Sequence, residues 1–154
     1  MGKGNQTAKD TGHRGLELVL AELTRRGARV EVGDTRKNLL CAYFDNGIRQ
    51  INIRTKAKGP NSLDWQVNLN DARSPEEPVD QNEYWILIDL STREPVYYIV
   101  PGALFRRDIY LVHDVWLKLH HGTRPVTPDS KHHRVTMDRI EAYRDRWDLL
   151  GLSR

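Results

Sequence analysis

Apolar and polar positions alternate most strictly between residues 49 and 58. Ile51, Ile53 and Thr55 fall on one side of an extended strand. The other side carries polar side chains without interruption, from Gln50, Asn52, Arg54 and Lys56. β-Branched residues on one face predict that this face is buried. The opposite face carries positive charge, so we expect it to line a cleft.

A turn signal directly precedes this strand. The tripeptide Asp45-Asn46-Gly47 lies between two apolar-rich runs and is typical of a β-hairpin. We therefore expect Lys37–Phe44 and Ile48–Lys58 to pair as antiparallel strands. A slip of one residue would turn Ile51 and Ile53 into the cleft, so the alternation fixes the register.

The N-terminal part of the chain predicts a helix followed by a strand. Residues His13–Arg26 carry apolar side chains at helical spacing, at Leu16, Val19, Leu20 and Leu23. Gly27 ends this helix, and Ala28–Val32 alternates as a strand does. We expect residues 1–10 to form a disordered tail and residues 11–154 to form a single domain.

Three further strands are expected in the second half. Leu63–Leu69 is predicted as a strand with Trp65 and Val67 on one face. Glu83–Leu90 is almost wholly apolar, which is typical of an interior strand covered on both faces. Pro95–Val100 is expected to return antiparallel to it.

The C-terminal third predicts two helices. The first begins at Pro101, with an inner stripe at Val112, Val115, Trp116 and Leu119, although residues 109–112 could instead be extended. Thr123–Lys131 is expected to be a loop. Thr136 is expected to cap a last helix, whose core positions are Ile140, Tyr143, Trp147 and Leu150, with Gly151 closing it. Helices at both ends of a set of strands predict an α/β/α sandwich around one mixed sheet.

A glutamate-bearing helix, a strand and a hairpin whose second strand reads Ile-Asn-Ile-Arg-Thr-Lys resemble the PD-(D/E)XK nuclease superfamily. The likeness is to its small restriction-endonuclease-like and resolvase-like members. It implies a restriction-endonuclease-like fold and places the catalytic positions at Glu17, Asn38, Asn52 and Arg54. In that family, the position of Asn38 holds an aspartate, that of Asn52 an acidic residue or glutamine, and that of Arg54 a lysine. Three of the four positions therefore differ in this chain.

The resemblance also implies a divalent cation, Mg²⁺ or Mn²⁺, held by Glu17, Asn38 and Asn52 if one is bound at all. Magnesium prefers anionic oxygen ligands, and two amides supply no charge against it. Arg54 keeps a positive charge but cannot transfer a proton, and its fork suits static phosphate contact. Metal-dependent cleavage and passive nucleic-acid binding both stay open as hypotheses.

Other acids could restore the metal site. A different register would make Asp34 or Asp45 the strand acid. Asp64 could supply a carboxylate from the predicted strand at residues 63–69, with Gln66 as a further ligand.

The charge of the chain permits an anionic partner. The formal net charge is +3 and the isoelectric point is about 9.1. Under the resemblance, DNA is the expected partner and its backbone phosphates would meet Arg14, Lys37, Arg54, Lys56 and Lys58. Such binding weakens steeply with salt.

A protein-interaction module is the alternative function, with the nuclease-like fold reused as an immunity, accessory or dimerisation subunit. The resemblance also makes a homodimer possible, because related nucleases often work as dimers. Such a dimer would leave an apolar patch on a strand edge or a helix. No apolar run is long enough to span a bilayer, and the lone Cys41 is compatible with a reducing cytoplasm, so we expect a cytoplasmic protein without membrane partners.

Overall fold

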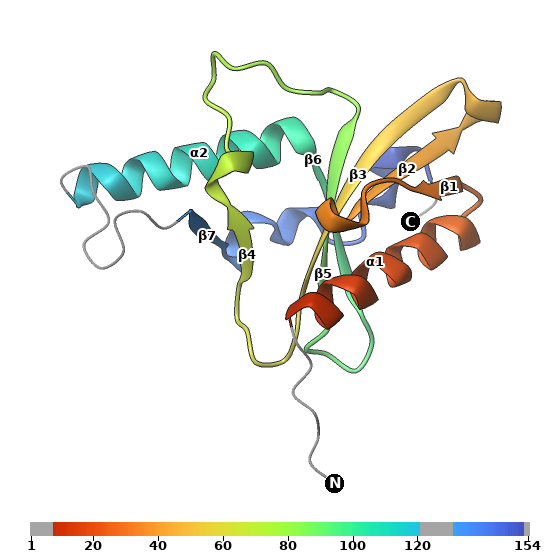
Figure 1. Cartoon of the computed structure of the whole chain (residues 1–154), viewed down its shortest axis with the longest axis horizontal. Coiled ribbons are helices and arrows are strands. Elements are labelled where there is room, and N and C mark those ends of the chain that lie inside the picture. Colours follow the sequence, from red (N-terminus) through yellow and green to blue (C-terminus); the bar gives the residue numbers. More distant parts are fainter. Residues whose placement is uncertain (1–7, 121–130, 153–154) are drawn as a thin grey trace, which may run out of the picture.

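A mixed five-stranded sheet forms the centre of the computed structural model, which describes residues 8–120 and 131–152 (Figure 1). The strands lie in the order β1-β2-β3-β5-β6. β3 and β5 run parallel, and the other neighbours are antiparallel. Their bounds are Arg29–Val32, Leu39–Phe44, Arg49–Lys58, Glu83–Asp89 and Val96–Pro101. The predicted α/β class and mixed central sheet are confirmed.

The predicted hairpin is confirmed, although its two strands begin two residues and one residue later than predicted. β2 and β3 pair antiparallel across residues 45–47, with Cys41 opposite Asn52 and Leu39 opposite Arg54. Asn46 and Gly47 have φ angles of 58° and 89°, which is why Asn-Gly serves in this turn. From Ile51 to Lys56, buried residues alternate with partly exposed ones, as the sequence pattern predicts, but Lys58 on the polar face is buried.

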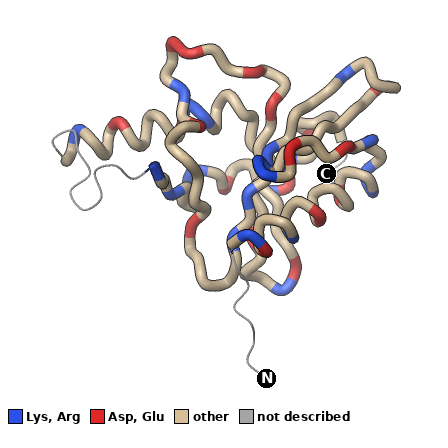
Figure 2. Tube along the Cα trace, in the orientation of Figure 1, with Lys and Arg blue, Asp and Glu red and all other residues tan. Residues whose placement is uncertain are grey.

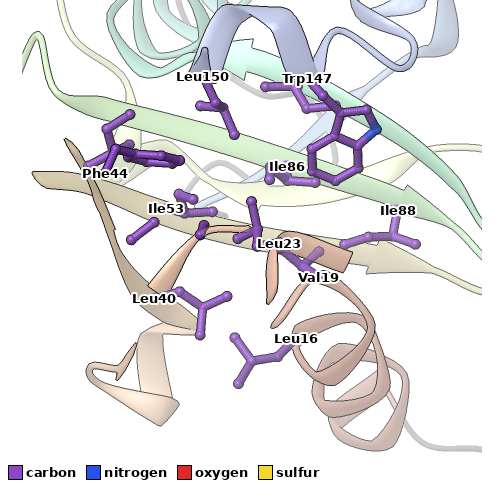
Figure 3. Packing of buried hydrophobic residues seen from close by; sticks show 14 residues of the cluster. Leu16, Val19, Leu23, Leu40, Phe44, Ile53, Ile86, Ile88, Trp147 and Leu150 are labelled. Carbon is purple, nitrogen blue, oxygen red and sulfur yellow. The ribbon is translucent and has the colours of Figure 1, made fainter. Parts of the chain in front are cut away.

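Helix α1 (Ala8–Arg25) packs on one face of the sheet. Its side chains Leu16, Val19 and Leu23 belong to one core cluster with isoleucines of β3, β5 and β6 (Figure 3). A Cβ on Gly15 would lie 2.7 Å from the Ala57 Cβ, so the glycine lets the helix approach β3 closely. The helix starts before the predicted position. Residues 8–10 therefore do not belong to a disordered tail, and residues 1–7 lie outside the described residues.

Helix α2 (Gly102–Leu119) packs on the opposite face. Phe105 and Ile109 join a second core cluster with Trp85 and Leu87 of β5. Since β5 contributes alternate residues to the two clusters, one helix lies on each side of the sheet. The inner stripe predicted at residues 112–119 is wrong. Phe105 and Ile109 are the buried apolar side chains of the helix, and this rotation leaves Val115 and Leu119 exposed. Residues 109–112 are helical, not extended.

The strand predicted at residues 63–69 is shorter and does not join the main sheet. β4 (Trp65–Asn68) pairs antiparallel with β7 (His132–Val135) in a separate two-stranded sheet. Trp65 and Val67 share a buried face as predicted, whereas Leu63 is exposed. Most of the predicted loop at residues 123–131 lies outside the described residues.

The predicted last helix is wrong. The segment forms three 3-10 turns, at Met137–Arg139, Glu141–Tyr143 and Trp147–Leu150. Ile140 and Tyr143 pack with the α2-side cluster, whereas Trp147 and Leu150 pack with the α1-side cluster. A single straight helix could not reach both faces of the sheet.

Between these turns the chain passes along the edge strand β6. Arg144 bridges to Tyr98, and the amide of Asp145 donates to the Tyr97 carbonyl at 2.9 Å. Within the described residues Thr136 makes no capping bond, but Gly151 closes the last turn with a φ of 80°. Over the same residues, no helix has both the length and the apolar character needed to cross a membrane.

Candidate functional site

The polar face of β3 lies on the α2 side of the sheet. Residues paired across neighbouring strands point to the same face, and Arg54, Lys56 and Lys58 pair with Trp85, Leu87 and Asp89 of β5. Basic side chains therefore lie beside the apolar residues on which α2 packs. Figure 2 shows basic and acidic positions mixed along the chain, so any positive patch is local.

Arg54 is held in place by several contacts. Its guanidinium stacks over the Trp85 ring at 4.6 Å, and its Nε donates to the Lys37 carbonyl at 2.9 Å. Its Nη1 lies 3.7 Å from the Asp71 Oδ1. Burial lowers the pKa of Arg54, against the opposing charge of Asp71. The side chain is fixed, as a static phosphate contact requires.

Arg106 of α2 neutralises two acids beside this site. It binds Glu83 through two hydrogen bonds of 2.7 Å, and its Nη1 donates to the Asp71 carbonyl at 3.0 Å. These bonds to Glu83 raise the pKa of Arg106. A Cβ on Gly102 would lie 2.5 Å from the Glu83 Oε2, so this glycine makes room for the carboxylate. Because Arg106 binds Glu83 and Asp71, these two carboxylates offset the positive charge of Arg54 and Lys56 only in part.

Lys56 carries the least compensated charge of the site. It is partly buried between Arg54 and Lys58 on β3, and its ammonium makes no hydrogen bond or ion pair with the residues that the structure describes. Burial lowers the pKa of Lys56, Asp71 raises it, and Arg54 lowers it further, with a net decrease. A bound anion would supply the missing partner.

Lys58 is buried and fully engaged. Its Nζ lies 3.0 Å from the Asp89 Oδ1 and 3.3 Å from the Ser62 carbonyl. The ammonium also lies 5.0 Å from the centre of the Trp65 ring. The exposed fraction of the residue is 6%. This placement corrects the prediction that Lys58 contacts phosphates, because the side chain faces the interior and is already paired.

The two remaining predicted DNA contacts lie apart. Lys37 is exposed at the end of a 3-10 turn (Thr35–Lys37), and its carbonyl holds Arg54, so it borders the site. Arg14 is exposed on α1, which covers the other face of the sheet. Lys37 therefore joins the candidate site, and Arg14 does not.

The predicted metal ligands do not converge. Asn52 lies on the α2 side, where it donates to Asp80 at 3.2 Å and its Oδ1 lies 3.6 Å from the Cys41 Sγ. Asn38 has a left-handed conformation with a φ of 49°, and its Nδ2 lies 3.4 Å from the position of a Cβ on Gly12 of α1. Asn38 therefore precedes β2 and turns toward the other face.

Glu17, the helix acid, is exposed on α1, with its carboxylate 3.1 Å from the His13 Nε2. The alternative acids are also dispersed. Asp34 accepts from the Arg36 amide, and Asp45 lies in the hairpin turn. Asp64 precedes β4, and Gln66 is exposed on it. Among the described residues, no three histidine, cysteine or acidic side chains cluster as a metal site would require.

Sequence reasoning missed the residues that surround Arg54. Trp85 lies in the predicted interior strand at residues 83–90, and Asp71 lies outside every predicted helix and strand. Glu83 opens a buried strand and Arg106 lies one turn into α2. An acid at the start of a buried strand is a usable signal, because a buried carboxylate requires a cationic partner.

No protein-family model matches the chain, and a search of curated proteins returns no match. The nuclease resemblance therefore stays a prediction from the residues of the first helix and the hairpin.

Proposed function

We propose that this chain binds the phosphate backbone of DNA through the polar face of β3, without a metal-dependent hydrolytic step. The nuclease-like order of helix and hairpin suggests the ligand class. Arg54 and Lys56, bordered by Lys37, would make the contacts.

The observation that carries this proposal is the Lys56 ammonium, which has no hydrogen-bond or ion-pair partner among the described residues. A desolvated cation without a partner lowers stability, and proteins keep such groups mainly at functional sites. Arg54 beside it is fixed by the Trp85 ring, the Lys37 carbonyl and Asp71, so its guanidinium is already oriented before a phosphate binds. Together they form a preorganised pair of cations.

The residues at the predicted metal positions argue for binding over cleavage. Asn52 is engaged by Asp80 and Cys41, and Asn38 lies on the other side of the sheet. Hydrolysis of a phosphodiester by this route requires anionic ligands gathered around the ion. Divalent cations should therefore be dispensable for binding.

Fluorescence anisotropy with a labelled DNA duplex tests the proposal. We expect affinity to fall steeply between low and moderate salt and to be equal in magnesium and in EDTA. Lys56→Gln should lower affinity about tenfold. The control Arg93→Gln removes the same charge from the exposed turn between β5 and β6 and should have a much smaller effect.

Three outcomes would contradict the proposal. Lys56→Gln and Arg93→Gln could weaken binding equally, which would indicate a general charge effect. Magnesium-dependent nicking of the duplex would show that hydrolysis survives. Undetectable binding at low salt would favour the alternative function as a protein-interaction module.

A further inference from the structure

The outward side of α2 carries a row of exposed apolar residues. The exposed fractions are 53% for Leu104, 54% for Leu111, 49% for Val115 and 74% for Leu119. Their spacing places them along one side of the helix. Figure 1 shows that the C-terminal part of α2 extends past the central sheet. We call these four residues the α2 stripe.

An apolar recess lies beside the N-terminal half of the stripe. It has a volume of about 310 Å³. Its apolar lining comes from Val100, Leu104, Phe105, Leu111 and Tyr143, and the charged Arg107, Asp108 and Arg139 complete it. The other end of the stripe projects, because Val115 and Leu119 are exposed beyond the recess. The N-terminal half of α2 thus borders a recess, and its C-terminal half carries Val115 and Leu119, which could fill a recess of this kind.

We infer that the α2 stripe binds a second copy of this chain, with the two α2 helices antiparallel about a two-fold axis close to Leu111. A two-fold axis at Leu111 brings Val115 of the second copy opposite position 107 and Leu119 opposite position 103. At a rise of about 1.5 Å per residue, these side chains reach the recess beside Leu104. The same contact forms twice, as a two-fold interface requires.

Charges along one edge of the stripe fit this antiparallel arrangement. Arg107 and Asp114 lie on the same side of α2, since a separation of seven residues is about two helical turns. The two-fold axis places Arg107 beside Asp114 of the second copy. Arg107 Nε is buried without a hydrogen-bond partner among the described residues. Asp114 already lies 2.9 Å from Lys118, and its carboxylate can accept further bonds.

The size of the surface indicates a weak dimer. Helix α2 has 18 residues and is therefore about 27 Å long. An interface based on one such helix lies at the low end of specific interfaces, so we expect micromolar affinity. Arg106 points from α2 toward Glu83, away from the stripe, so the dimer leaves the polar face of β3 open.

Sedimentation equilibrium tests the dimer. The full chain should form dimers with rising concentration, and Leu111→Asp should be monomeric over the same range. The control Ile48→Asp changes an equally apolar residue that is 89% exposed in the hairpin turn, and it should still dimerise. A monomeric parent chain, or a dimer unaffected by Leu111→Asp, would overturn the inference. Thermal unfolding of each variant verifies that it is folded.

Disulfide cross-linking tests the position of the axis. In a Cys41→Ser background, Leu111→Cys should cross-link to itself under mild oxidation, because residues near a two-fold axis meet their own copies. Leu104→Cys should not. Arg107→Asp should weaken the dimer at least fivefold, and adding Asp114→Arg should restore most of the loss. Equal cross-linking at both positions, or no rescue by the charge exchange, would refute this antiparallel register.

Discussion

Lys56 and Lys58 lie two residues apart on the same face of β3, yet the fold treats them in opposite ways. Lys58 is buried against Asp89 and the Ser62 carbonyl. Lys56 is partly buried and makes no such contact with described residues. One end of the polar face is thus a buried ion pair, while the middle holds a cation that has no anionic partner within residues 8–120 and 131–152.

A basic strand face is therefore not a binding site along its whole length. Asp89 lies directly opposite Lys58 in the parallel pairing, whereas Lys56 lies opposite the apolar Leu87. The residue on the neighbouring strand therefore decides which lysine forms a structural ion pair and which lysine is available to bind a ligand. Identical substitutions at the two positions should separate these roles.

Lys58→Met should give the largest effect. It leaves the Asp89 carboxylate buried without its cation, and breaking a buried pair in this way costs about 3–5 kcal/mol. Urea unfolding at neutral pH measures the loss. The double variant Lys58→Met with Asp89→Leu should regain much of it, because no unpaired charge remains. A single variant within about 1 kcal/mol of the parent would show that the ion pair is not structural.

The second-largest effect should come from acid, which should lower the stability of the fold through the Asp89 carboxyl. Burial raises the pKa of Asp89, but hydrogen bonds from Ser91 and Lys58 outweigh it, so the pKa lies below its ordinary value of 3.8. A carboxyl with a lowered pKa stabilises the fold above that ordinary value. This stability is lost as pH falls from 3.8 through the folded-state pKa. The Met/Leu double variant should unfold with a shallower pH dependence in this range.

Arg54→Lys should have a moderate effect. A lysine keeps the charge but loses the planar stack on Trp85 and the geometry of the bond to the Lys37 carbonyl, at a cost of about 1 kcal/mol. Urea unfolding measures this change, and anisotropy should show weaker DNA binding in the same variant. Retained stability together with unchanged affinity would show that the fork of Arg54 is unimportant.

Lys56→Met should have the smallest effect on stability and the opposite sign. The pKa of Lys56 is lowered in the fold, so the unfolded chain holds this proton more strongly and protonation favours unfolding. Parent stability should rise as pH increases from the folded-state pKa toward the ordinary value of 10.5, and the variant should lack this rise. At neutral pH the variant should be slightly more stable. A clear loss of stability would mean that Lys56 has a structural role.

The hairpin shows what local pattern can predict, and the C-terminal segment shows where it fails. Residues 45–47 and the alternation of β3 predicted both the turn and the buried face of the strand, because turn chemistry and one buried face are local properties. Ile140, Tyr143, Trp147 and Leu150 have helical spacing as well. However, they pack on two different faces of the sheet, and spacing cannot reveal which face receives each side chain.

Local patterns in the sequence were sufficient to predict the α/β class, the central hairpin and the polar face of β3. Tertiary structure alone decided that Asp89 closes off Lys58, that Arg106 engages Glu83 and Asp71, and that α2 turns Val115 and Leu119 outward. The physical reason is that alternation and turn propensity act between near neighbours along the chain. Charge pairing and helix rotation depend instead on residues brought together from distant segments.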